Sequence, residues 1–547
     1  MTSHLDHATT LVDVLEQVVA TGAAHLAEAV TVDGRVSTGQ IDDRGQVAYD
    51  LATLGSTVRA ARSLLDLARR TGDDELATLA LVFAADTHAD VFARLTGRWE
   101  EWGVHTDDVG LVRDGVVAAV ALGRSTEVLD EVADRVLATG EAGNRHLGEE
   151  LAMVRDAFRR FATDRVMPIA EHVHRDDADI PDDIIDGLAE MGCFALSIPV
   201  EHGGMADGGP DELLNMVVVT EELSRGSLGV AGSLITRPEI IGTAILKGGT
   251  QDQKQRWLPT IASGEKMCAV AVTEPDYGSD VASMKVTATR DGDDWILNGV
   301  KTWCTFAGRA EYMLVLARTD EDRAMGHRGL SLFVVDKPRF AGHEWSVAQD
   351  GGGTMEARAI PTLGYRGMHS FEVAIDGWRV PHANLIGEED GLGQGFYLQM
   401  QAFANARLQT AARALGVMQA ALEEAVAYAG QRHVFGTALG DYALTRAKIA
   451  RMAAIVAATR AFAFEVARML ASGNGQLEAS MVKQLACRVA EWVTREAQQL
   501  HGGYGYAEEY TVSRLFVDAR VLSIFEGADE VLALRVIARQ LLADAAS

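Results

Sequence analysis

The feature that most constrains the fold is a change in the period of the apolar residues along the chain. From Lys266 onward they alternate with polar residues in runs such as MCAVAVTE, EYMLVLART and GLSLFVVD, a period typical of β-strands. Only turns rich in Gly and Asp separate these runs, so we expect an antiparallel sheet or barrel. On both sides of this region apolar residues recur every three or four positions, which predicts helices. The predicted fold is therefore mainly α with a central antiparallel β domain.

The same changes of period divide the 547-residue chain into four predicted domains. A composition shift ends a helical extension over residues 1–145. A second helical domain over 146–265 precedes the β domain over 266–388, and a helical bundle over 389–547 ends the chain. In this bundle two long Ala-rich segments and a third helix precede a glycine-rich break, HGGYGYAEEY.

The extension has the pattern of packed helices. Five apolar residues fall on one face of its second helix: Leu51, Leu54, Val58, Ala61 and Leu65. Gly72 should end this helix, and Asp73 or Asp74 should cap the next one. Because no His, Cys or carboxylate residues cluster there at catalytic spacing, we expect a role in packing or assembly.

Composition and charge exclude several classes of protein. The net charge of −28 argues against a nucleic-acid-binding protein and against adhesion to an anionic membrane. The N-terminus lacks a signal pattern, and no apolar run approaches the roughly 20 residues that span a bilayer. The cysteines are scattered without the spacing of a metal site or a disulfide framework: Cys193, Cys268, Cys304 and Cys487. We therefore expect a cytoplasmic protein with reduced thiols and no bound metal.

Two motifs in the β region carry side chains suited to a cofactor. TEPDYGSD forms a turn in which Thr273 and Ser279 place hydroxyls beside backbone N–H groups, as a phosphate or a polar ring edge requires. In KTWCT, strand alternation puts Trp303 and Thr305 on the same side, where a Trp can pack on a flat ring and a hydroxyl can donate to it. Taken alone, each motif is more readily explained by ordinary structure, the first by a hairpin and the second by a core Trp.

Three motifs in the C-terminal helices add further candidates. QRHVFG places Arg432 three residues before Phe435, a helical spacing that offers a cation to a pyrophosphate and a ring for stacking. QLHGGYGY is a helix end whose bare backbone lets a ligand approach. In IFEGADE, Glu526 follows the apolar residues Ile524 and Phe525. An apolar setting raises the pKa of a carboxyl group and makes it a usable base. A solvated Arg, a core Phe and a helix-capping Glu are the alternatives.

Together these motifs resemble the acyl-CoA dehydrogenase family of flavoenzymes in order and approximate spacing. The resemblance runs from about His146 to the end, and it includes RDAFRRFATDRVMPIA, FALSIPVEHGG and RVPHANLIG. It implies FAD between the β domain and the C-terminal bundle, and electron-transfer flavoprotein as the acceptor of the electrons. It also implies a homo-oligomer, at least a dimer, because a neighbouring subunit completes each flavin site.

The family's functional residues carry over onto matching positions. The cofactor-binding positions are Val272, Thr273, Ser279, Trp303, Thr305, Arg432, Phe435, Gln499, Gly502 and Gly503. The resemblance implies that the last five reach the FAD of a neighbouring subunit. The substrate-binding positions are Tyr277, Ser279, Arg366, Arg407 and Gly527. Glu526 matches the catalytic base; a branch of the family keeps its base instead at the position that Ala406 occupies here.

Departures from the common pattern narrow the implied substrate. Asp276, Tyr277 and Phe306 replace residues that are usually small, and the extension itself is unusual. These features imply a short, branched acyl-CoA with a second carboxylate, and we expect methylsuccinyl-CoA to be oxidised to mesaconyl-CoA, a step of the ethylmalonyl-CoA pathway. Tyr277, Arg366 and His369 are chemically suited to bind that carboxylate.

Several alternatives remain open on the sequence. The first is a dehydrogenase of butyryl-, isovaleryl- or glutaryl-CoA. The second is an oxidase or a flavin monooxygenase with the same fold, and the third is a helical assembly protein with a vestigial site. The amphipathic helices of the extension could cover the surface through which dimers pair into tetramers, so we expect a dimer.

Overall fold

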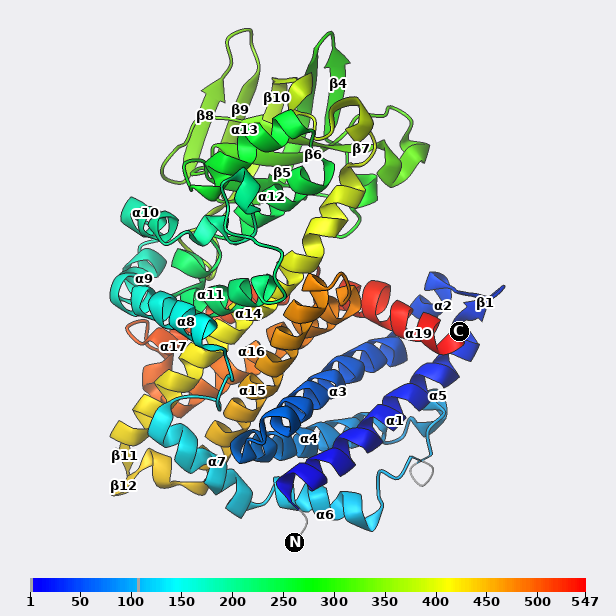
Figure 1. The fold of residues 1–547 in the computed structure, drawn as a ribbon, viewed down its shortest axis with the longest axis vertical. Coiled ribbons are helices and arrows are strands. Elements are labelled where there is room, and N and C mark those ends of the chain that lie inside the picture. Colours follow the sequence, from blue (N-terminus) through cyan, green and yellow to red (C-terminus); the bar gives the residue numbers. More distant parts are fainter. Residues whose placement is uncertain (1–2, 106–108) are drawn as a thin grey trace. The chain divides into compact units, whose positions relative to one another are not determined.

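The computed structural model describes residues 3–105 and 109–547 (Figure 1). They form two compact units. The first contains the N-terminal extension, up to residue 153, together with the C-terminal helices from residue 410 onward, and the second contains residues 154–409. The long helix α14, Gly395–Gln431, begins in the second unit and ends in the first.

The first unit is built almost entirely from helices, as expected. Its N-terminal helices are α1 His4–Val30, α2 Thr38–Asp43, α3 Gly45–Thr71, α4 Asp74–Leu95, α5 Trp99–Trp102, α6 Asp114–Gly123 and α7 Thr126–Thr139, and a short hairpin joins β1 Thr31–Val32 to β2 Arg35–Val36. Its C-terminal helices are α15 Ala443–Ala471, α16 Gln476–Leu500, α17 Thr511–Leu522, α18 Asp529–Val531 and α19 Arg539–Ala546.

The helix signals of the extension are confirmed. All five residues of the predicted apolar face, Leu51 to Leu65, are buried on α3. Gly72 ends this helix in the left-handed conformation, with φ of 64°. Asp73 caps α4 and accepts hydrogen bonds from the N–H groups of Glu75 and Leu76, at 2.9 and 3.2 Å.

The extension packs against the C-terminal helices of the same unit. Helices α3 and α4 lie against α15, and α3 also contacts α16. Polar contacts reinforce this packing: Arg446 Nε lies 2.6 Å from Asp130 Oδ1, and the Ser56 hydroxyl donates to Gln484 Oε1 at 3.0 Å. The extension therefore shares one core with the bundle that follows residue 410.

One helix in the described ranges, α4, is long and apolar enough to cross a membrane by length and composition. Most of its apolar window is buried inside the first unit, where α4 packs against α1, α3 and α15. Its apolar character is therefore explained by its place in the core of the unit.

The four cysteines are free and buried, as expected for reduced thiols. Burial raises the pKa of each thiol above its usual 9.0. These thiols are therefore protonated at neutral pH and behave as small apolar side chains of the core.

The second unit places helices beside a curled sheet. Its helices are α8 Glu149–Phe161, which begins just before the unit, α9 Met167–Arg175, α10 Asp182–Glu190, α11 Glu212–Gly226, α12 Thr236–Gly248 and α13 Gln251–Ala262. Its strands are β3 Cys268–Ala271, β4 Thr287–Asp291, β5 Asp294–Thr305, β6 Tyr312–Arg318, β7 Leu330–Asp336, β8 Glu344–Ala348, β9 Thr354–Ala359 and β10 Ser370–Pro381.

The sheet is largely antiparallel, with one departure from the expectation. The strand order is β3-β6-β4-β5-β10-β9-β8, and β7 pairs with β6. Strands β3 and β6 run parallel, with Cys268 opposite Tyr312, and β4 touches β6 in parallel at one residue pair. The β4–β5 hairpin lies between β3 and β6 in the sequence and returns the chain to the same edge, so a parallel pair forms without an intervening helix.

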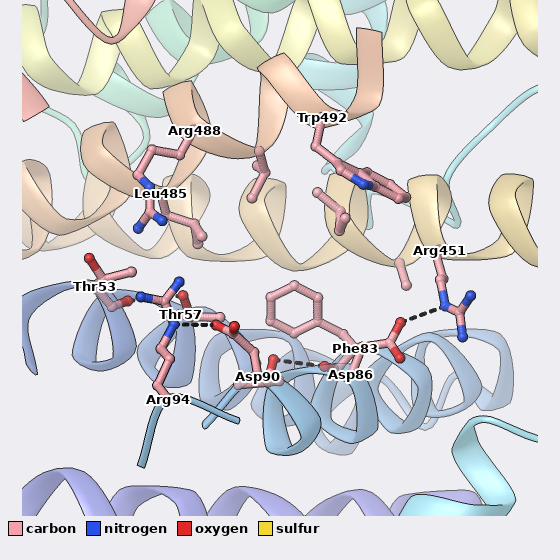
Figure 2. Close-up of a pocket in the computed structure, with 14 residues that line it drawn as sticks. Thr53, Thr57, Phe83, Asp86, Asp90, Arg94, Arg451, Leu485, Arg488 and Trp492 are labelled. Atoms are coloured by element: carbon pink, nitrogen blue, oxygen red, sulfur yellow. Dashed lines mark hydrogen bonds and ion pairs between the residues drawn. The ribbon is translucent and has the colours of Figure 1, made fainter. Parts of the chain in front are cut away.

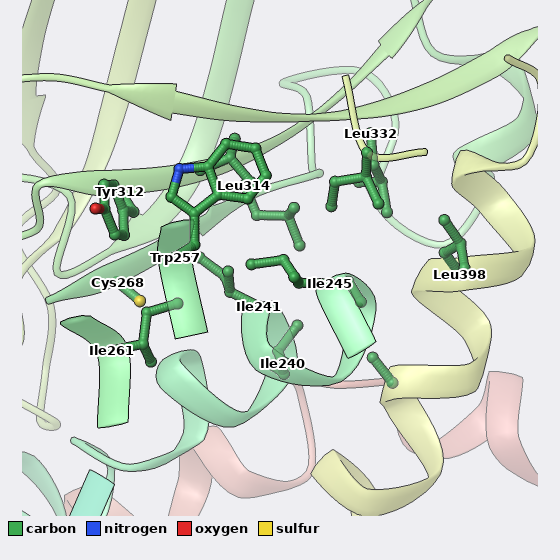
Figure 3. Packing of buried hydrophobic residues seen from close by; sticks show 14 of the residues in the cluster. Ile240, Ile241, Ile245, Trp257, Ile261, Cys268, Tyr312, Leu314, Leu332 and Leu398 are labelled. Carbon is green, nitrogen blue, oxygen red and sulfur yellow. The ribbon is translucent and has the colours of Figure 1, made fainter. Parts of the chain in front are cut away.

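Apolar side chains fill both faces of this sheet. On one face, Trp257 and Ile261 of α13 and Ile241 of α12 pack against Leu314 and Leu332 of the strands (Figure 3). On the other face, aromatic residues from several strands form a second cluster: Trp295, Phe333, Trp345, Phe371 and Trp378. This double burial fixes the strands whose ends carry the predicted flavin residues.

Candidate active site

The predicted base Glu526 lies in a strained loop between α17 and α18. Its φ is 54° and that of Gly527 is 101°, so both residues are in the left-handed region. For a residue with a side chain this conformation costs about 1–3 kcal/mol and persists only where surrounding contacts hold it. The Glu526 side chain is 11% exposed. A strained, nearly buried carboxylate of this kind is typical of a functional position.

Two residues of α14 hold the Glu526 carboxylate. The Arg413 guanidinium donates to Glu526 Oε2 at 2.7 Å, and the Thr410 hydroxyl donates to the same oxygen. Arg413 is fully buried, and the Phe525 ring lies 4.7 Å from its guanidinium carbon. The expectation of an apolar setting was therefore wrong: the sequence neighbours of Glu526 are apolar, but a distant helix places a buried Arg against its carboxylate.

A second buried cation holds the next residue of the loop. Lys483 Nζ, on α16, donates to the Gly527 carbonyl at 2.7 Å. Burial lowers the pKa of Lys483, and the carboxylates of Glu526 and Asp529 partly offset that effect. The peptide that follows the candidate base is thus fixed by a hydrogen bond from an adjacent helix.

The motif with Arg432 and Phe435 is a hairpin rather than the expected helix. Helix α14 ends at Gln431, and strands β11 His433–Val434 and β12 Thr437–Ala438 pair across a two-residue turn. Phe435 and Gly436, with φ of 51° and 83°, form the left-handed pair that such a tight turn requires. The sequence signal was the Gly after Phe435, which was not read as a turn. The Phe435 side chain is fully exposed at the tip.

This hairpin and the glycine-rich helix end line one cavity of about 530 Å³. Arg432 contributes a cation, and a Cβ on either Gly502 or Gly503 would meet nothing within 4 Å, so the backbone faces open space. His501 stacks on Tyr428 with 4.1 Å between ring centroids. Gln499, predicted with this group, is exposed on α16 and is not among the lining residues. A cation, aromatic rings and bare backbone fit a pyrophosphate or a nucleotide.

The predicted flavin residues of the β domain lie on β5 and the turn after β3. The alternation expected in KTWCT fails at Trp303, whose φ of 57° coincides with an irregular register between β5 and β10. Trp303 is 54% exposed, whereas Thr305 is buried and its hydroxyl lies 2.9 Å from that of Ser370. The irregularity presents a large aromatic face to the surroundings, as stacking on a planar ring requires.

A buried ion pair that was not predicted stabilises the turn after β3. Lys301 Nζ lies 2.9 Å from Glu274 Oε1 and donates to the Val272 carbonyl at 2.9 Å. Glu274 also accepts from the N–H groups of Lys285 and Val286, at 2.7 and 2.9 Å. Burial lowers the pKa of Lys301, and the Glu274 charge opposes the shift. A charged residue inside the run NGVKTWCT was the available signal.

The predicted substrate-binding residues have different surroundings. Ser279 is exposed and Tyr277 is half-buried beside Lys285, whose Nζ lies 5.1 Å from its ring centroid. Arg366 donates to the carbonyls of Thr362 and His174, at 3.1 and 2.9 Å, so backbone groups already engage its guanidinium. Arg407 lies half-buried on α14. Their contacts with a substrate stay predictions.

His369 belongs to a titratable group that the sequence analysis did not identify. Potential ligand atoms of Asp177, His343 and His369 all lie within 4.8 Å of one another. Within the described residues, this group has the spacing that a metal ion would require. His369 Nε2 also lies 3.3 Å from Asp179. Asp177 and Asp179 therefore already lie next to the His369 imidazole, which we predicted to bind the substrate carboxylate.

Comparison with known proteins identifies the family to which the domains of this chain belong. Residues 148–265, 269–377 and 393–542 match the N-terminal, middle and C-terminal domains of acyl-CoA dehydrogenases. The (2S)-methylsuccinyl-CoA dehydrogenase of Cereibacter sphaeroides is 40% identical over 96% of both chains. Butyryl-CoA dehydrogenase from Megasphaera elsdenii has a similar solved structure, with a TM-score of 0.66 and 29% identity over 73% of this chain and 99% of that one.

The chain belongs to the acyl-CoA dehydrogenase family. The match to the methylsuccinyl-CoA enzyme covers 96% of the chain, a share that must include most of the extension. The family assignment makes the chain an FAD-dependent oxidoreductase that acts on an acyl-CoA.

The cofactor assignment agrees with the residues present. A solved glutaryl-CoA dehydrogenase from Mycobacterium smegmatis, in complex with FADH2, is 25% identical over 72% of this chain and 95% of that one, with a TM-score of 0.61. The exposed Trp303 face in the second unit suits a planar flavin, and the cavity beside Arg432 in the first unit separately suits phosphate groups. These residues would hold FAD, which supplies the redox chemistry that no side chain provides.

The buried ion pair between Lys301 and Glu274 leads to a prediction. We expect Lys301→Met to destabilise the protein by about 3–5 kcal/mol and to lower the FAD content, because it leaves the buried Glu274 carboxylate without its cation. Thermal unfolding and the ratio of flavin to protein absorbance measure both effects. The matched control is Lys285→Met, which breaks the exposed ion pair with Asp276 and should change stability by less than about 1 kcal/mol. Equal behaviour of the two variants would contradict the assigned role.

Proposed function

We propose that this enzyme oxidises a short, branched, dicarboxylic acyl-CoA, (2S)-methylsuccinyl-CoA, to mesaconyl-CoA. The observation that carries the proposal is the Glu526 loop: α14 holds the nearly buried carboxylate, α16 holds the Gly527 carbonyl, and the Glu526 backbone is left-handed. The substrate class is supported by the 40% identity to a methylsuccinyl-CoA dehydrogenase across the extension and the catalytic domains. Electron-transfer flavoprotein is the proposed acceptor of the electrons.

In the proposed reaction, Glu526 removes the α-proton of the thioester. That hydrogen is only weakly acidic, so the developing enolate charge needs hydrogen-bond donors at the thioester oxygen, and the N–H of Glu526 is the proposed donor from the protein. FAD, when bound, supplies the acceptor for the hydride that leaves the β-carbon. Lys483 fixes the neighbouring Gly527 peptide, and Arg413 with Thr410 fixes the carboxylate before the substrate arrives.

Removal of the base carboxylate tests this assignment. Glu526→Gln keeps the shape of the side chain but cannot take a proton, so we expect kcat to fall by about 10²–10⁴-fold while FAD stays bound. Glu530→Gln is the control, because Glu530 is an exposed carboxylate four residues away. Steady-state turnover with an artificial electron acceptor measures both variants. Near-normal turnover of the Glu526→Gln variant would show that another group is the base.

The substrate is tested by anaerobic titration of the oxidised enzyme. We expect methylsuccinyl-CoA to bleach the yellow flavin band rapidly, because only this ester has both the branch and the second carboxylate proposed here. Butyryl-, isovaleryl- and glutaryl-CoA, added separately, should bleach it much more slowly. Faster bleaching by one of these esters would overturn the proposed substrate and keep the family; no bleaching by any of them would contradict dehydrogenation itself.

We also propose that the flavin site is completed by a second copy of the chain in a homodimer. The Phe435 ring is fully exposed at the tip of a tight hairpin, an unusual position for a large apolar side chain. This proposal explains the exposure, because the ring would contact the FAD of the partner subunit.

The proposed contact between Phe435 and FAD can be tested by measuring FAD affinity. We expect Phe435→Ala to weaken FAD binding by about tenfold, since it removes one stacking contact. Leu363→Ala removes another strongly exposed apolar side chain, in the second unit, and should leave FAD affinity unchanged. Titration of the apoprotein with FAD, with light scattering to give the mass, checks both. An unchanged affinity in the Phe435→Ala variant would refute the contact.

A further inference from the structure

A side chain of the N-terminal extension forms a hydrogen bond at the end of the candidate base's loop. Tyr49, in the first turns of α3, donates its hydroxyl hydrogen to Asp529 Oδ2, and Asp529 begins α18 three residues after Glu526. Burial and this hydrogen bond raise the pKa of Tyr49 to about 12. The phenol is therefore protonated, and able to donate, throughout the neutral range.

We propose that Tyr49 is a positioning residue for Glu526, so that the extension takes part in setting the geometry of the base. This inference rests on the proposed function, because it assumes that Glu526 is the base. Tyr49 acts through Asp529 and the Glu526–Asp529 backbone.

The base loop needs such support because its conformation is strained. Glu526 and Gly527 are both left-handed, and the segment between α17 and α18 consists of turns and bends. Its two ends are tied together by the Asp529 N–H, which donates to the Ser523 carbonyl at 3.2 Å. Helix α14 holds the carboxylate of Glu526 and α16 holds the carbonyl of Gly527. Tyr49 adds α3 of the extension to these supports.

Asp529 depends strongly on the Tyr49 hydroxyl. Its side chain is almost completely buried, and its other oxygen, Oδ1, has no hydrogen-bond partner in the described part of the chain. Without the phenol, a buried carboxylate would lose the donor that satisfies it, a change that is costly unless the group moves. The movement available to Asp529 displaces the loop that contains Glu526.

A cavity interrupts the packing of α3 close to Tyr49. A cavity of about 270 Å³ lies between helices α3 and α4 on one side and α15 and α16 on the other (Figure 2). Thr53, one turn after Tyr49, lines it together with Arg488, whose guanidinium carbon lies 5.8 Å from the Tyr49 ring centroid. Because packing is incomplete one turn from Tyr49, its hydrogen bond to Asp529 supplements the packing of α3 against the segment that follows the base loop.

Tyr49→Phe tests the proposal, because it removes one oxygen and keeps the ring beside Arg488. We expect kcat to fall about tenfold while KM and FAD content stay within twofold of wild type, since the base is displaced but the binding residues are not. The double variant Tyr49→Phe with Asp529→Asn removes the buried charge as well, and should recover about threefold of the lost rate.

A readout that does not depend on activity separates this proposal from the proposed function. Hydrogen exchange of the resting enzyme should be faster over residues 523–531 in Tyr49→Phe than in wild type. Asp86→Asn is the matched control: it breaks the 2.8 Å ion pair with Arg451 across the same cavity (Figure 2), away from the loop. It should change neither the exchange of 523–531 nor kcat.

Two outcomes would overturn the inference. One is wild-type kcat with wild-type exchange in Tyr49→Phe, and the other is an equal loss in Tyr49→Phe and Asp86→Asn, which would reflect general destabilisation. If wild type itself fails to bleach with every thioester, the proposed function fails, while a faster exchange confined to 523–531 would still show that Tyr49 holds the loop.

Discussion

The contact between Arg413 and Glu526 is the interaction on which the site depends. A fully buried guanidinium needs an anion, and at 2.7 Å the Glu526 carboxylate provides it. Glu526 makes this contact in a left-handed conformation, and hydrogen bonds from α14 and α16 hold the loop. The same contact holds in place the side chain that we propose as the base.

Local sequence signals predicted helices and their ends correctly where neighbouring residues determine the backbone conformation. Helix α3, its stop at Gly72 and the cap at Asp73 follow from periodicity and from the backbone preferences of single residues. The motif containing Glu526 also identified the loop between two helices. These features involve neighbours in sequence, and the structure confirms them.

The sequence analysis was wrong where distant residues decide the structure. Arg413 lies more than a hundred residues before Glu526, so no local pattern revealed the cation beside the carboxylate. The bulge at Trp303 arises from pairing with β10, and the parallel pair of β3 and β6 arises from the order of strands in the sheet. The turn at Phe435 was a local signal, but the preceding helical pattern of α14 concealed it.

The extension is best understood as part of the catalytic bundle. Its helices share a core with α15 and α16, and ion pairs and hydrogen bonds run along that contact. Relatives such as butyryl-CoA dehydrogenase match only 73% of the chain. In this chain the added helices reach the end of the Glu526 loop through Tyr49, which is how we propose that the extension positions the base.

The central claim, that Glu526 faces the α-carbon of a bound thioester, is tested most directly by a crystal structure. The Glu526→Gln variant with FAD and methylsuccinyl-CoA would be suitable, because the missing base prevents turnover. The account predicts that the substituted side chain at position 526 lies about 3–3.5 Å from the α-carbon, the separation of a near-attack geometry. A structure in which a different carboxylate or imidazole occupies that position, with residue 526 turned away, would contradict it.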